Sequence, residues 1–590
     1  MLTTSTTEVW EPYAEPIAGP VQLIDCGGLT FRATAEDSTA RLVGEGIIEL
    51  VLTSADGPVR AEWRLPCVDV TALWTPDTMA GKGIPAAWSA PKEVSLSRGA
   101  PIASLVGTGD VGRCTFAAAE VDVLAAGGVF EETGEFRFWV QAQGRLTLRV
   151  DVSGRHFARC LADLTAWWLA DRGIGSVDIP ATARKPAYST WYSMHQAVTP
   201  EAVEEQARLG KELGLDLIIV DDGWMTPDRG RGYGHTGDWE PLSLPDTAAH
   251  VARVHDLGVE YMLWYAIPFI GKESTVWERF QPYALSRAES LDAMIVDPRC
   301  PAVRAYLADL LCRAVEEWGM DGLKIDFLDW FAREEAPPAG PEADCATVSE
   351  GVDKLLGEIR TRITAVRPTA LVEFRQPYVS PGLWPHATML RATDCPLSGL
   401  DNRQRTTDVR LAAGPIPVHA DMLMWHPEEP AEQVACHLIN VLFAVPQISV
   451  DLATLTPQQH QSLVFWLGIF RRYEQTLQQG AFEPARPDLG YPLIRAHDAR
   501  VQIVARHAAL PVSAAGAWDE LLVANADTDP WVRLTDGSGS ATVLVRDARG
   551  RSVWAGSIDL GVPGGAVFEV PRGGLAELSR DAVGRGFRRN

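Results

Sequence analysis

The spacing of apolar and polar residues divides the chain into three consecutive stretches. Up to about residue 180, short runs alternate apolar and polar side chains, as at Gly46–Thr53, Glu135–Gln141 and Arg145–Val152, with Gly, Pro and Asp between them. This period of two predicts half-buried β-strands. Arg155–Arg172 has helical spacing and leads to Pro180, where the pattern changes. We therefore predict an N-terminal β-sandwich domain over residues 1–182.

From about residue 186 to residue 473, short apolar runs alternate with longer amphipathic segments. The runs predict eight strands, at Ala187–Ser193, Leu215–Val220, Val259–Trp264, Gly322–Asp326, Ala370–Phe374, Met389–Arg391, Ile416–His419 and Gln447–Val450. The segments predict helices at Pro200–Leu213, Asp246–Leu257, Pro301–Trp318, Val348–Val366, Gln404–Ala413, Pro430–Phe443 and Thr456–Tyr473. This alternation predicts a central (β/α)₈ TIM barrel over residues 183–476. A doubly wound sheet is the alternative, but no glycine-rich phosphate turn follows the first strand.

After about residue 480 the alternating pattern of strands returns. It predicts strands at Arg500–Ala505, Glu520–Ala524, Ala541–Arg546, Ser552–Ile558 and Ala566–Val570. These strands suffice for one small β-sandwich. We therefore predict a C-terminal β-sandwich domain over residues 477–590, and a multidomain protein of α/β and β class.

Composition narrows the class of function. The chain has 53 Lys and Arg against 77 Asp and Glu, a net charge of −24, and 46% of its residues are hydrophobic. A folded, strongly acidic protein is a poor ligand for nucleic acid or for an anionic membrane. The nine cysteines include no CxxC pair, the first residues lack the features of a signal peptide, and no uncharged apolar run reaches 18 residues. We therefore expect a cytoplasmic protein with reduced thiols.

Polar residues follow the predicted barrel strands at the ends where a TIM barrel carries its site. Strand two ends in VDDGW with Asp221 and Asp222, and strand four reads LKID, which puts Lys324 and Asp326 on one face. For each pair we keep a structural alternative: a turn cap beside a surface charge for the first, and a buried ion pair for the second.

Strand six continues into RATD, which brings Arg391 close to Asp394. A local salt bridge between these two residues is a third structural alternative. Such a contact would lower the pKa of Asp394 and make it a poor proton donor.

Further polar or aromatic side chains belong to the same set of strand ends. They are Trp191, Tyr192 and His195 after strand one, Asp238 and Trp239 after strand two, Trp264 on strand three, Glu373 and Arg375 on strand five, and His419, Asp421 and His426 around strand seven. Each lone histidine is more simply a core or surface residue than a metal ligand, and no HxH pair marks strand one. We expect neither a metal nor another cofactor.

Asp326 and Asp394 are the most informative pair, because strands four and six can place them across a central pocket. Two carboxylates across a pocket are what glycoside hydrolysis requires: one attacks the anomeric carbon and the other protonates the leaving oxygen. Glu373 and Asp421 remain alternatives to Asp394 as the acid.

Several segments in order give the barrel its resemblance to a known family. They are VDDGW at Val220–Trp224, GDW at Gly237–Trp239, HDLGVEYMLW at His255–Trp264, DPRCPAVRAYL at Asp297–Leu307, LKID at Leu323–Asp326, RATD at Arg391–Asp394 and VPQISVDL at Val445–Leu452. Together they resemble the retaining α-galactosidase clan, in particular glycoside hydrolase family 36, the melibiase-like enzymes, over roughly residues 187–473.

The resemblance implies a double displacement with net retention. In it, Asp326 is the nucleophile and Asp394 the general acid/base. Substrate-binding residues would be Asp221, Asp222, Lys324 and Arg391, with Trp191, Trp239 and Trp264 as pocket walls. Three segments depart from the family pattern: Ile325 stands where a Trp is usual, YAIPF follows strand three, and FRQPYVSPG follows strand five. The last of these places Arg375 in the pocket, where it could favour an anionic or differently substituted sugar.

These observations favour a retaining exo-α-glycosidase, α-galactosidase-like, that acts on small oligosaccharides or glycosides. Three alternatives stay open: an enzyme of the same clan with a sugar other than galactose, a metal-dependent TIM-barrel enzyme, and a non-catalytic barrel that binds carbohydrate. The expected partner is a small carbohydrate, with no nucleic acid and no membrane, and the composition is compatible with a homo-oligomer.

Overall fold

The computed structural model describes residues 19–76, 82–171, 178–227, 230–332 and 336–580. The chain forms two compact units. One comprises Met1–Gly175 with Pro377–Leu383, and the other comprises Ser176–Gln376 with Trp384–Asn590. The predicted barrel and the C-terminal β domain fall in the same unit, so the proposed division into three domains stays a prediction. Among the described residues, no helix has the length and hydropathy needed to cross a membrane.

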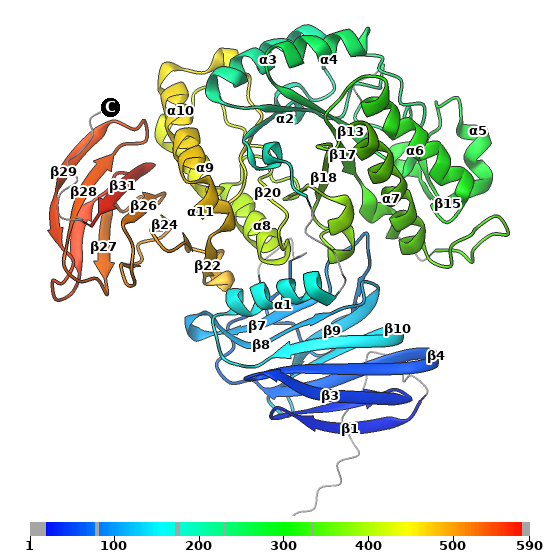
Figure 1. Cartoon of the computed structure of the whole chain (residues 1–590), viewed down its shortest axis with the longest axis horizontal. Helices are drawn as coiled ribbons and strands as arrows, with labels where there is room; N and C mark the ends of the chain where they lie inside the picture. The colour runs from blue at the N-terminus through cyan, green and yellow to red at the C-terminus, as the bar shows by residue number, and fades with distance from the viewer. Residues whose placement is uncertain (1–18, 77–81, 172–177, 228–229, 333–335, 581–590) are drawn as a thin grey trace, which may run out of the picture. The chain divides into compact units, whose positions relative to one another are not determined.

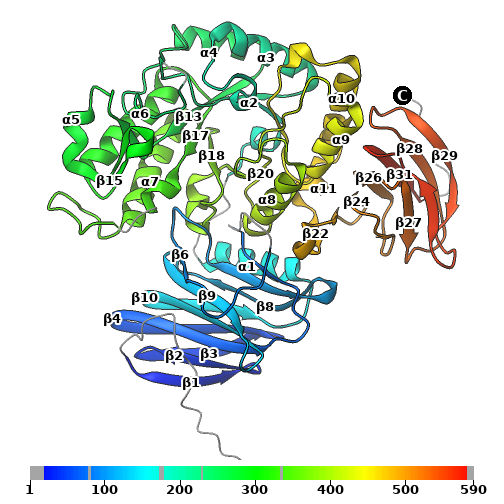
Figure 2. The same cartoon turned by 180° about the vertical axis from the view of Figure 1, so that it is seen from behind.

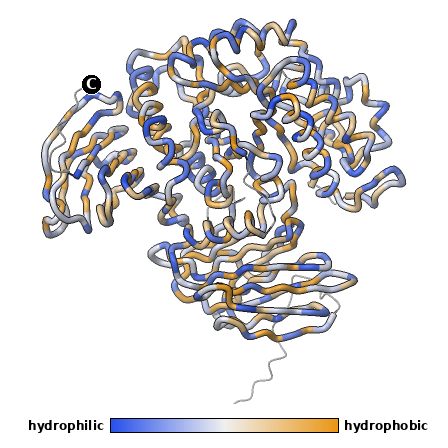
Figure 3. The backbone as a smooth tube through the Cα atoms, viewed as in Figure 1, coloured by the Kyte–Doolittle hydropathy of each residue, from blue (hydrophilic) through white to orange (hydrophobic). Residues whose placement is uncertain are grey.

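The first unit is a β-sandwich made from one continuous sheet (Figure 1). Its strands are β1 (Val21–Cys26), β2 (Leu29–Thr34), β3 (Asp37–Gly44), β4 (Ile47–Pro66), β5 (Ala72–Trp74), β6 (Lys92–Val94), β7 (Ile102–Gly107), β8 (Val111–Ala118), β9 (Val123–Phe130) and β10 (Glu135–Asp151). Its helix is α1 (Phe157–Asp171). Apolar and polar segments alternate along its strands, as the pattern predicts (Figure 3).

Two long strands, β4 and β10, run through both layers of this sandwich. They pair in two stretches, residues 58–66 of β4 with 135–143 of β10 and residues 47–53 with 145–151, and the register shifts between Gln143 and Arg145. Gly144 lies there with φ +66°, a left-handed conformation that favours glycine. The two halves then fold face to face, and Trp63 of one layer meets Phe116 of the other edge-on, with ring centroids 5.0 Å apart. The two runs predicted at residues 135–141 and 145–152 are therefore one bent strand.

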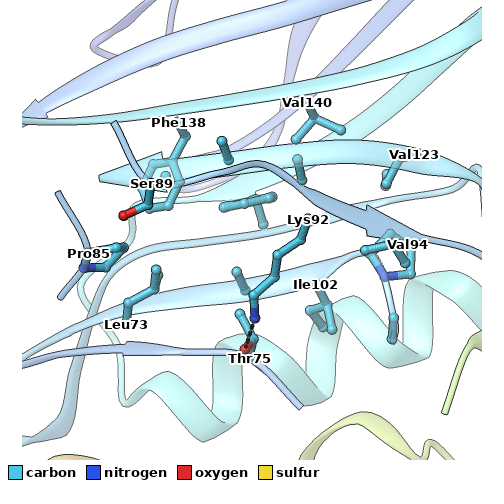
Figure 4. A pocket seen from close by; sticks show the side chains of 18 of the residues that line it. Leu73, Thr75, Pro85, Ser89, Lys92, Val94, Ile102, Val123, Phe138 and Val140 are labelled. Carbon is cyan, nitrogen blue, oxygen red and sulfur yellow. Dashed lines mark hydrogen bonds between the residues drawn. The ribbon is translucent and has the colours of Figure 1, made fainter. Parts of the chain in front are cut away.

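A cavity of about 250 Å³ remains between the two layers (Figure 4). Its walls are mainly aliphatic, with Phe116 and Phe138, and Lys92 lies at the rim with its Nζ 3.4 Å from Thr75 Oγ1. Small side chains such as Ala125 leave this space open.

The second unit contains the barrel. Its parallel strands are β11 (Ala187–Ser189), β12 (Leu217–Val220), β13 (Glu260–Ala266), β17 (Gly322–Asp326), β18 (Leu371–Arg375), β19 (Met389–Arg391), β20 (Val418–His419) and β21 (Gln447–Ile448). Two parallel bridges, His419 to Val445 and Leu423 to Ile448, connect the β20 segment to the β21 segment and close the barrel. The predicted TIM barrel and flanking β-rich regions are confirmed.

Helices alternate with these strands, and α6 and α7 lie outside β13, β17 and β18 in both views (Figure 1, Figure 2). The helices are α2 (Trp191–Met194), α3 (Pro200–Leu213), α4 (Thr247–Asp256), α5 (Trp277–Phe280), α6 (Pro301–Glu316), α7 (Val348–Val366), α8 (Gly399–Ala412), α9 (Ala431–Asn440), α10 (Pro457–Arg472) and α11 (Glu474–Gln479). Their ends follow local chemistry: Thr199 caps α3 by accepting from Ala202 N, and Gly214 ends that helix in the left-handed conformation.

The barrel interior changes from apolar to polar along the strands. Leu217, Met262, Leu371 and Met389 belong to a buried cluster at the beginning of the strands. Two residues further on, Glu373 follows Leu371 and Arg391 follows Met389, and Lys324 of β17 pairs in register with Glu373. The polar residues therefore gather where the strands end.

The C-terminal part of the second unit contains a seven-stranded and a three-stranded sheet around one apolar core. Its strands are β22 (Ala481–Ala485), β23 (Leu493–His497), β24 (Val501–Arg506), β25 (Val512–Ser513), β26 (Glu520–Asn525), β27 (Trp531–Thr535), β28 (Ser540–Arg546), β29 (Ser552–Asp559), β30 (Ala566–Glu569) and β31 (Gly574–Ser579).

Three details differ from the expected elements of the barrel. The first strand stops at Ser189, and Trp191–Met194 form a helical turn in place of strand. Helix α8 begins at Gly399, because Ser398 accepts from Asp401 N and caps it there. A small antiparallel sheet of β14 (Phe269–Gly271), β15 (Ala284–Ala288) and β16 (Ala293–Val296) stands between β13 and α6, where no strand was expected.

Candidate active site

Asp326, the last residue of β17, carries a buried carboxylate held by several donors. Its Oδ1 accepts from Phe327 N at 2.7 Å and from Arg375 Nε at 2.5 Å, and its Oδ2 accepts from Trp264 Nε1 at 3.0 Å. Burial alone would raise the pKa of this carboxyl, but the positive charges of Arg375 and Lys324 outweigh burial and hold the pKa well below its usual range. Asp326 is therefore an ionised, oriented carboxylate.

The backbone after Asp326 is strained. Phe327 has φ +65°, a left-handed conformation that is costly for an aromatic residue. The Arg375 guanidinium lies 5.2 Å from the centroid of the Phe327 ring, and the ring of Tyr233 packs edge-on against it with centroids 5.3 Å apart. Strain of this kind persists only where the surroundings fix it, and here they fix the position of Asp326.

Asp394 lies three residues beyond β19, and its side chain is 52% exposed. Arg391 Nη2 donates to its Oδ1 at 2.9 Å. Burial would raise the pKa of Asp394, but the positive charges of Arg391, Arg375 and Lys324 together outweigh it and lower the pKa, while the charge of Asp326 acts in the opposite direction. The local salt bridge considered from the sequence is present, and it favours the ionised form of Asp394 in the ligand-free chain.

The two other candidate acids are more deeply buried. Glu373 is fully buried and accepts from Gln447 Nε2 at 2.6 Å, and burial raises its pKa. Asp421 is also fully buried and pairs with Arg391, and burial raises its pKa to about 6. Of the three candidate acids, Asp394 is the one with an exposed side chain.

The VDDGW carboxylates follow β12. Asp221 pairs with the ammonium of Lys324, so the buried ion pair of Lys324 is with this residue. Asp222 accepts from Gln196 Nε2 at 3.1 Å, while its buried Oδ1 has no hydrogen-bond partner within the described residues. Burial, with the neighbouring charge of Asp221, raises the pKa of Asp222 to about 7. A buried, unsatisfied carboxyl oxygen is costly unless a ligand supplies the partner.

The three expected wall residues differ in position. Trp264 reaches Asp326 directly, as described above. Trp239 is fully buried, with its ring centroid 5.0 Å from that of Tyr265 and 6.1 Å from that of Trp264, so it packs against the wall from the core. Trp191 is half-buried on α2, with the Arg231 guanidinium 5.6 Å from its ring.

Residues that sequence reasoning missed are Tyr233, Phe327 and Gln196. Tyr233 stacks on Phe269 with centroids 5.2 Å apart, and it comes from a loop without strand or helix periodicity. Among the predicted histidines, His419 is a core residue whose Nε2 bonds to Ala183 O at 2.8 Å, and His426 is exposed. Within the part of the chain that the structure describes, no group of three or more His, Cys, Asp or Glu side chains is arranged to hold a metal ion.

Comparisons with known proteins identify similar sequences and similar folds. The Melibiase family model matches residues 182–352. The α-galactosidase 2 of Pediococcus pentosaceus is 25% identical over 146 residues, which cover 23% of this chain and 20% of that protein. The A type blood α-D-galactosamine galactosaminidase of Flavonifractor plautii is 27% identical over 146 residues, or 21% of this chain and 13% of that protein. The matched segment thus spans a fifth or less of these curated relatives.

Solved structures resemble the chain over much more of its length. The family 36 α-galactosidase AgaA of Geobacillus stearothermophilus has a TM-score of 0.61 at 14% identity, covering 93% of this chain and 81% of that one. The α-galactosidase of Lactobacillus brevis has a TM-score of 0.63 at 13% identity, covering 95% and 81%. These likenesses show the fold. The predicted resemblance is therefore confirmed: residues 182–352 match the Melibiase family model, within a chain that has the fold of family 36 α-galactosidases.

Proposed function

We propose that this chain is a retaining exo-α-glycosidase, α-galactosidase-like, that hydrolyses terminal α-linked sugars of small oligosaccharides or glycosides. The observation that carries the proposal is a pair of dissimilar carboxylates at one rim of the barrel. Asp326 is buried, oriented and ionised, whereas Asp394 is exposed two strands further on. The Melibiase match supports the same reading.

In the proposed reaction, an Asp326 oxygen attacks the anomeric carbon, while Asp394 gives its proton to the leaving oxygen. This forms a glycosyl ester on Asp326. Asp394, now ionised, takes a proton from water as that water attacks the ester, and the sugar leaves with retained configuration. Trp264 and Arg375 lose a charged acceptor when the ester forms and regain it on release.

Recognition of the sugar is assigned to the polar residues after β12 and β17. The unpaired Oδ1 of Asp222 would bond a sugar hydroxyl, and the paired Asp221 and Lys324 would bond others. The position of Arg375 beside Asp326 favours a second candidate function. This is an enzyme of the same clan whose sugar carries an anionic or other substituent.

The test is turnover of aryl α-glycosides, with the galactoside, glucoside, N-acetylgalactosaminide, galactosaminide, arabinopyranoside, xyloside and galacturonide in parallel. We expect one of them to be hydrolysed, with the α-anomer of the product appearing first by ¹H NMR, and Asp326→Ala to abolish the reaction. Turnover that a chelator abolishes would favour the metal-dependent alternative. Tight sugar binding without any turnover would favour the non-catalytic one.

We further propose a cytoplasmic location and a homo-oligomer. All nine cysteines are free thiols, which is typical of a reducing compartment. Light scattering coupled to size exclusion would measure the number of subunits.

A further inference from the structure

The guanidinium of Arg391 is divided between two carboxylates of opposite exposure. Nη1 donates to Asp421 Oδ1 at 2.5 Å and Nη2 donates to Asp394 Oδ1 at 2.9 Å. Arg391 and Asp421 are buried, whereas Asp394 is half exposed. One cation therefore joins a fixed interior carboxylate to the candidate acid at the rim.

We call Arg391 with its two carboxylate partners, Asp421 and Asp394, the fork. The buried side of the fork, formed by Asp421, is rigid. Asp421 Oδ2 accepts from Cys395 N at 2.7 Å and from Tyr192 OH at 3.0 Å. The Asp421 backbone exchanges two hydrogen bonds with the side chain of Asn402, at 2.8 and 3.1 Å. Neither the carboxylate of Asp421 nor the Arg391 branch that it holds can move without breaking several buried bonds.

The charge of Asp421 affects how strongly Arg391 attracts the carboxylate of Asp394. Asp394 and Asp421 are the two carboxylates whose charges act most strongly on Arg391, and Glu373 and Asp326 follow. While Asp421 is ionised, it compensates part of the charge of Arg391 and weakens the attraction of the guanidinium for the Asp394 carboxylate. Without that anion, the buried guanidinium would attract the Asp394 carboxylate more strongly, which favours the ionised form of Asp394 further. Within the described residues, the other ionisable groups that act on Asp394, Asp421 or Arg391 include Asp326 and Lys324 from β17, Glu373 and Arg375 from β18, Cys395 after β19, Arg405 from α8, His419 from β20 and Tyr192 from α2.

We propose that Asp421 is a positioning residue that keeps Asp394 able to carry the catalytic proton, by holding Arg391 and compensating part of its charge. The inference rests on the proposed function, which makes Asp394 the proton donor. Asp421 itself does not exchange a proton with the substrate. Its charge lets Asp394 hold the proton until the leaving oxygen accepts it, and it lets Asp394 recover that proton from the attacking water.

Loss of the anion Asp421 and loss of the cation Arg391 should shift the pH profile in opposite directions. A purely structural role of these residues would not predict opposite shifts. Removal of the anion in Asp421→Asn leaves Arg391 to Asp394, so the alkaline limb of kcat/KM should move to lower pH by about one unit or more. Removal of the cation in Arg391→Met should move the same limb to higher pH. Tyr192→Phe removes one donor from Asp421 and should give a smaller downward shift, which keeps the test usable if Asp421→Asn folds poorly.

Asp321→Asn is the matched control. Asp321 is another buried carboxylate of the barrel, paired with Arg367 just before β17, and it also accepts from Tyr261 N at 2.7 Å and His255 Nε2 at 2.7 Å. Its loss should cost stability without moving the alkaline limb. Three results would each overturn the proposal. The alkaline limb could shift equally in Asp321→Asn and Asp421→Asn, it could shift in the same direction in Asp421→Asn and Arg391→Met, or it could stay in place in Asp421→Asn.

A measurement without turnover separates this inference from the proposed function. Titration of the Asp394 carboxyl by ¹³C NMR, with its signal assigned by its absence in Asp394→Asn, should show the same downward shift in Asp421→Asn. An Asp394 titration that does not change would overturn the inference even in an active enzyme. The expected shift in a chain that turns over no glycoside would leave the inference standing and contradict the proposed function alone.

Discussion

Arg375 holds the carboxylate of Asp326 by a 2.5 Å hydrogen bond from Nε to Oδ1. Because Asp326 must be ionised to attack, this cation extends the active range toward low pH. Arg375→Met should raise the pKa of Asp326 and move the acid limb of kcat upward by about one pH unit or more. Arg375→Lys should restore part of the effect.

Arg362→Met serves as the control for that pH profile. Arg362 pairs with Asp309 and Glu316 at the barrel surface, away from the rim, so its loss should leave both limbs in place. An acid limb that is the same in Arg375→Met and in the wild type would contradict a role for Arg375 in holding the nucleophile.

Replacement of the candidate acid should give an effect that depends on the leaving group. Asp394→Ala should reduce turnover of an alkyl or disaccharide substrate by about 10²–10⁴-fold, because the leaving oxygen then departs without a proton. A dinitrophenyl glycoside needs little protonation and should lose much less. Steady-state kinetics of both substrates measure the ratio. If Glu373→Gln shows this leaving-group dependence and Asp394→Ala does not, Asp394 is not the acid.

Asp222 should make the ligand-free chain less stable as the pH rises. Its pKa of about 7 in the folded chain lies above the ordinary value of 3.8, so the folded state binds this proton more tightly than the unfolded state. The stabilisation is complete below pH ~4 and is lost as the pH rises through ~7. Asp222→Asn should therefore leave the free energy of unfolding unchanged near pH 4 and increase it by about 1–3 kcal/mol at pH 8, while activity falls. Denaturant titrations at the two pH values measure the difference. A stability gain of equal size at both would contradict ionisation as the cause.

Two glycines of the barrel unit should respond to alanine in opposite ways. A Cβ on Gly322 would lie 2.4 Å from Leu371 O on the neighbouring strand, whereas a Cβ on Gly468 in α10 would meet nothing within 4 Å. Gly322→Ala should destabilise the unit by about 2 kcal/mol or more, because the β17–β18 pairing must separate. Gly468→Ala should stabilise it by about 0.5–1 kcal/mol through helix propensity. Thermal unfolding of the two variants beside the wild type tests the pair, and a loss of stability in Gly468→Ala would refute the second half.

The sequence predicts the barrel well because buried parallel strands read as short apolar runs and their polar ends stand out. The alternation of side chains along a strand predicts that Lys324 and Asp326 share one face, and both side chains are buried. What alternation cannot give is the partner of a charge: Lys324 pairs with Asp221, and Arg391 pairs with Asp421 as well as Asp394. The positions of Tyr233 and Phe327 could not be predicted from the sequence, because they depend on the conformation of loop backbone, including the left-handed φ of Phe327.

The shared strands of the N-terminal sandwich have a consequence for how that unit comes apart. Since β4 and β10 contribute backbone to both layers, neither layer possesses a complete set of strands of its own. Fraying at an outer edge such as β1 can remain local, but separation of β4 from β10 dissolves both layers at once. The amide protons along these two strands should therefore exchange with solvent in a single cooperative event, at the slowest rate of the unit.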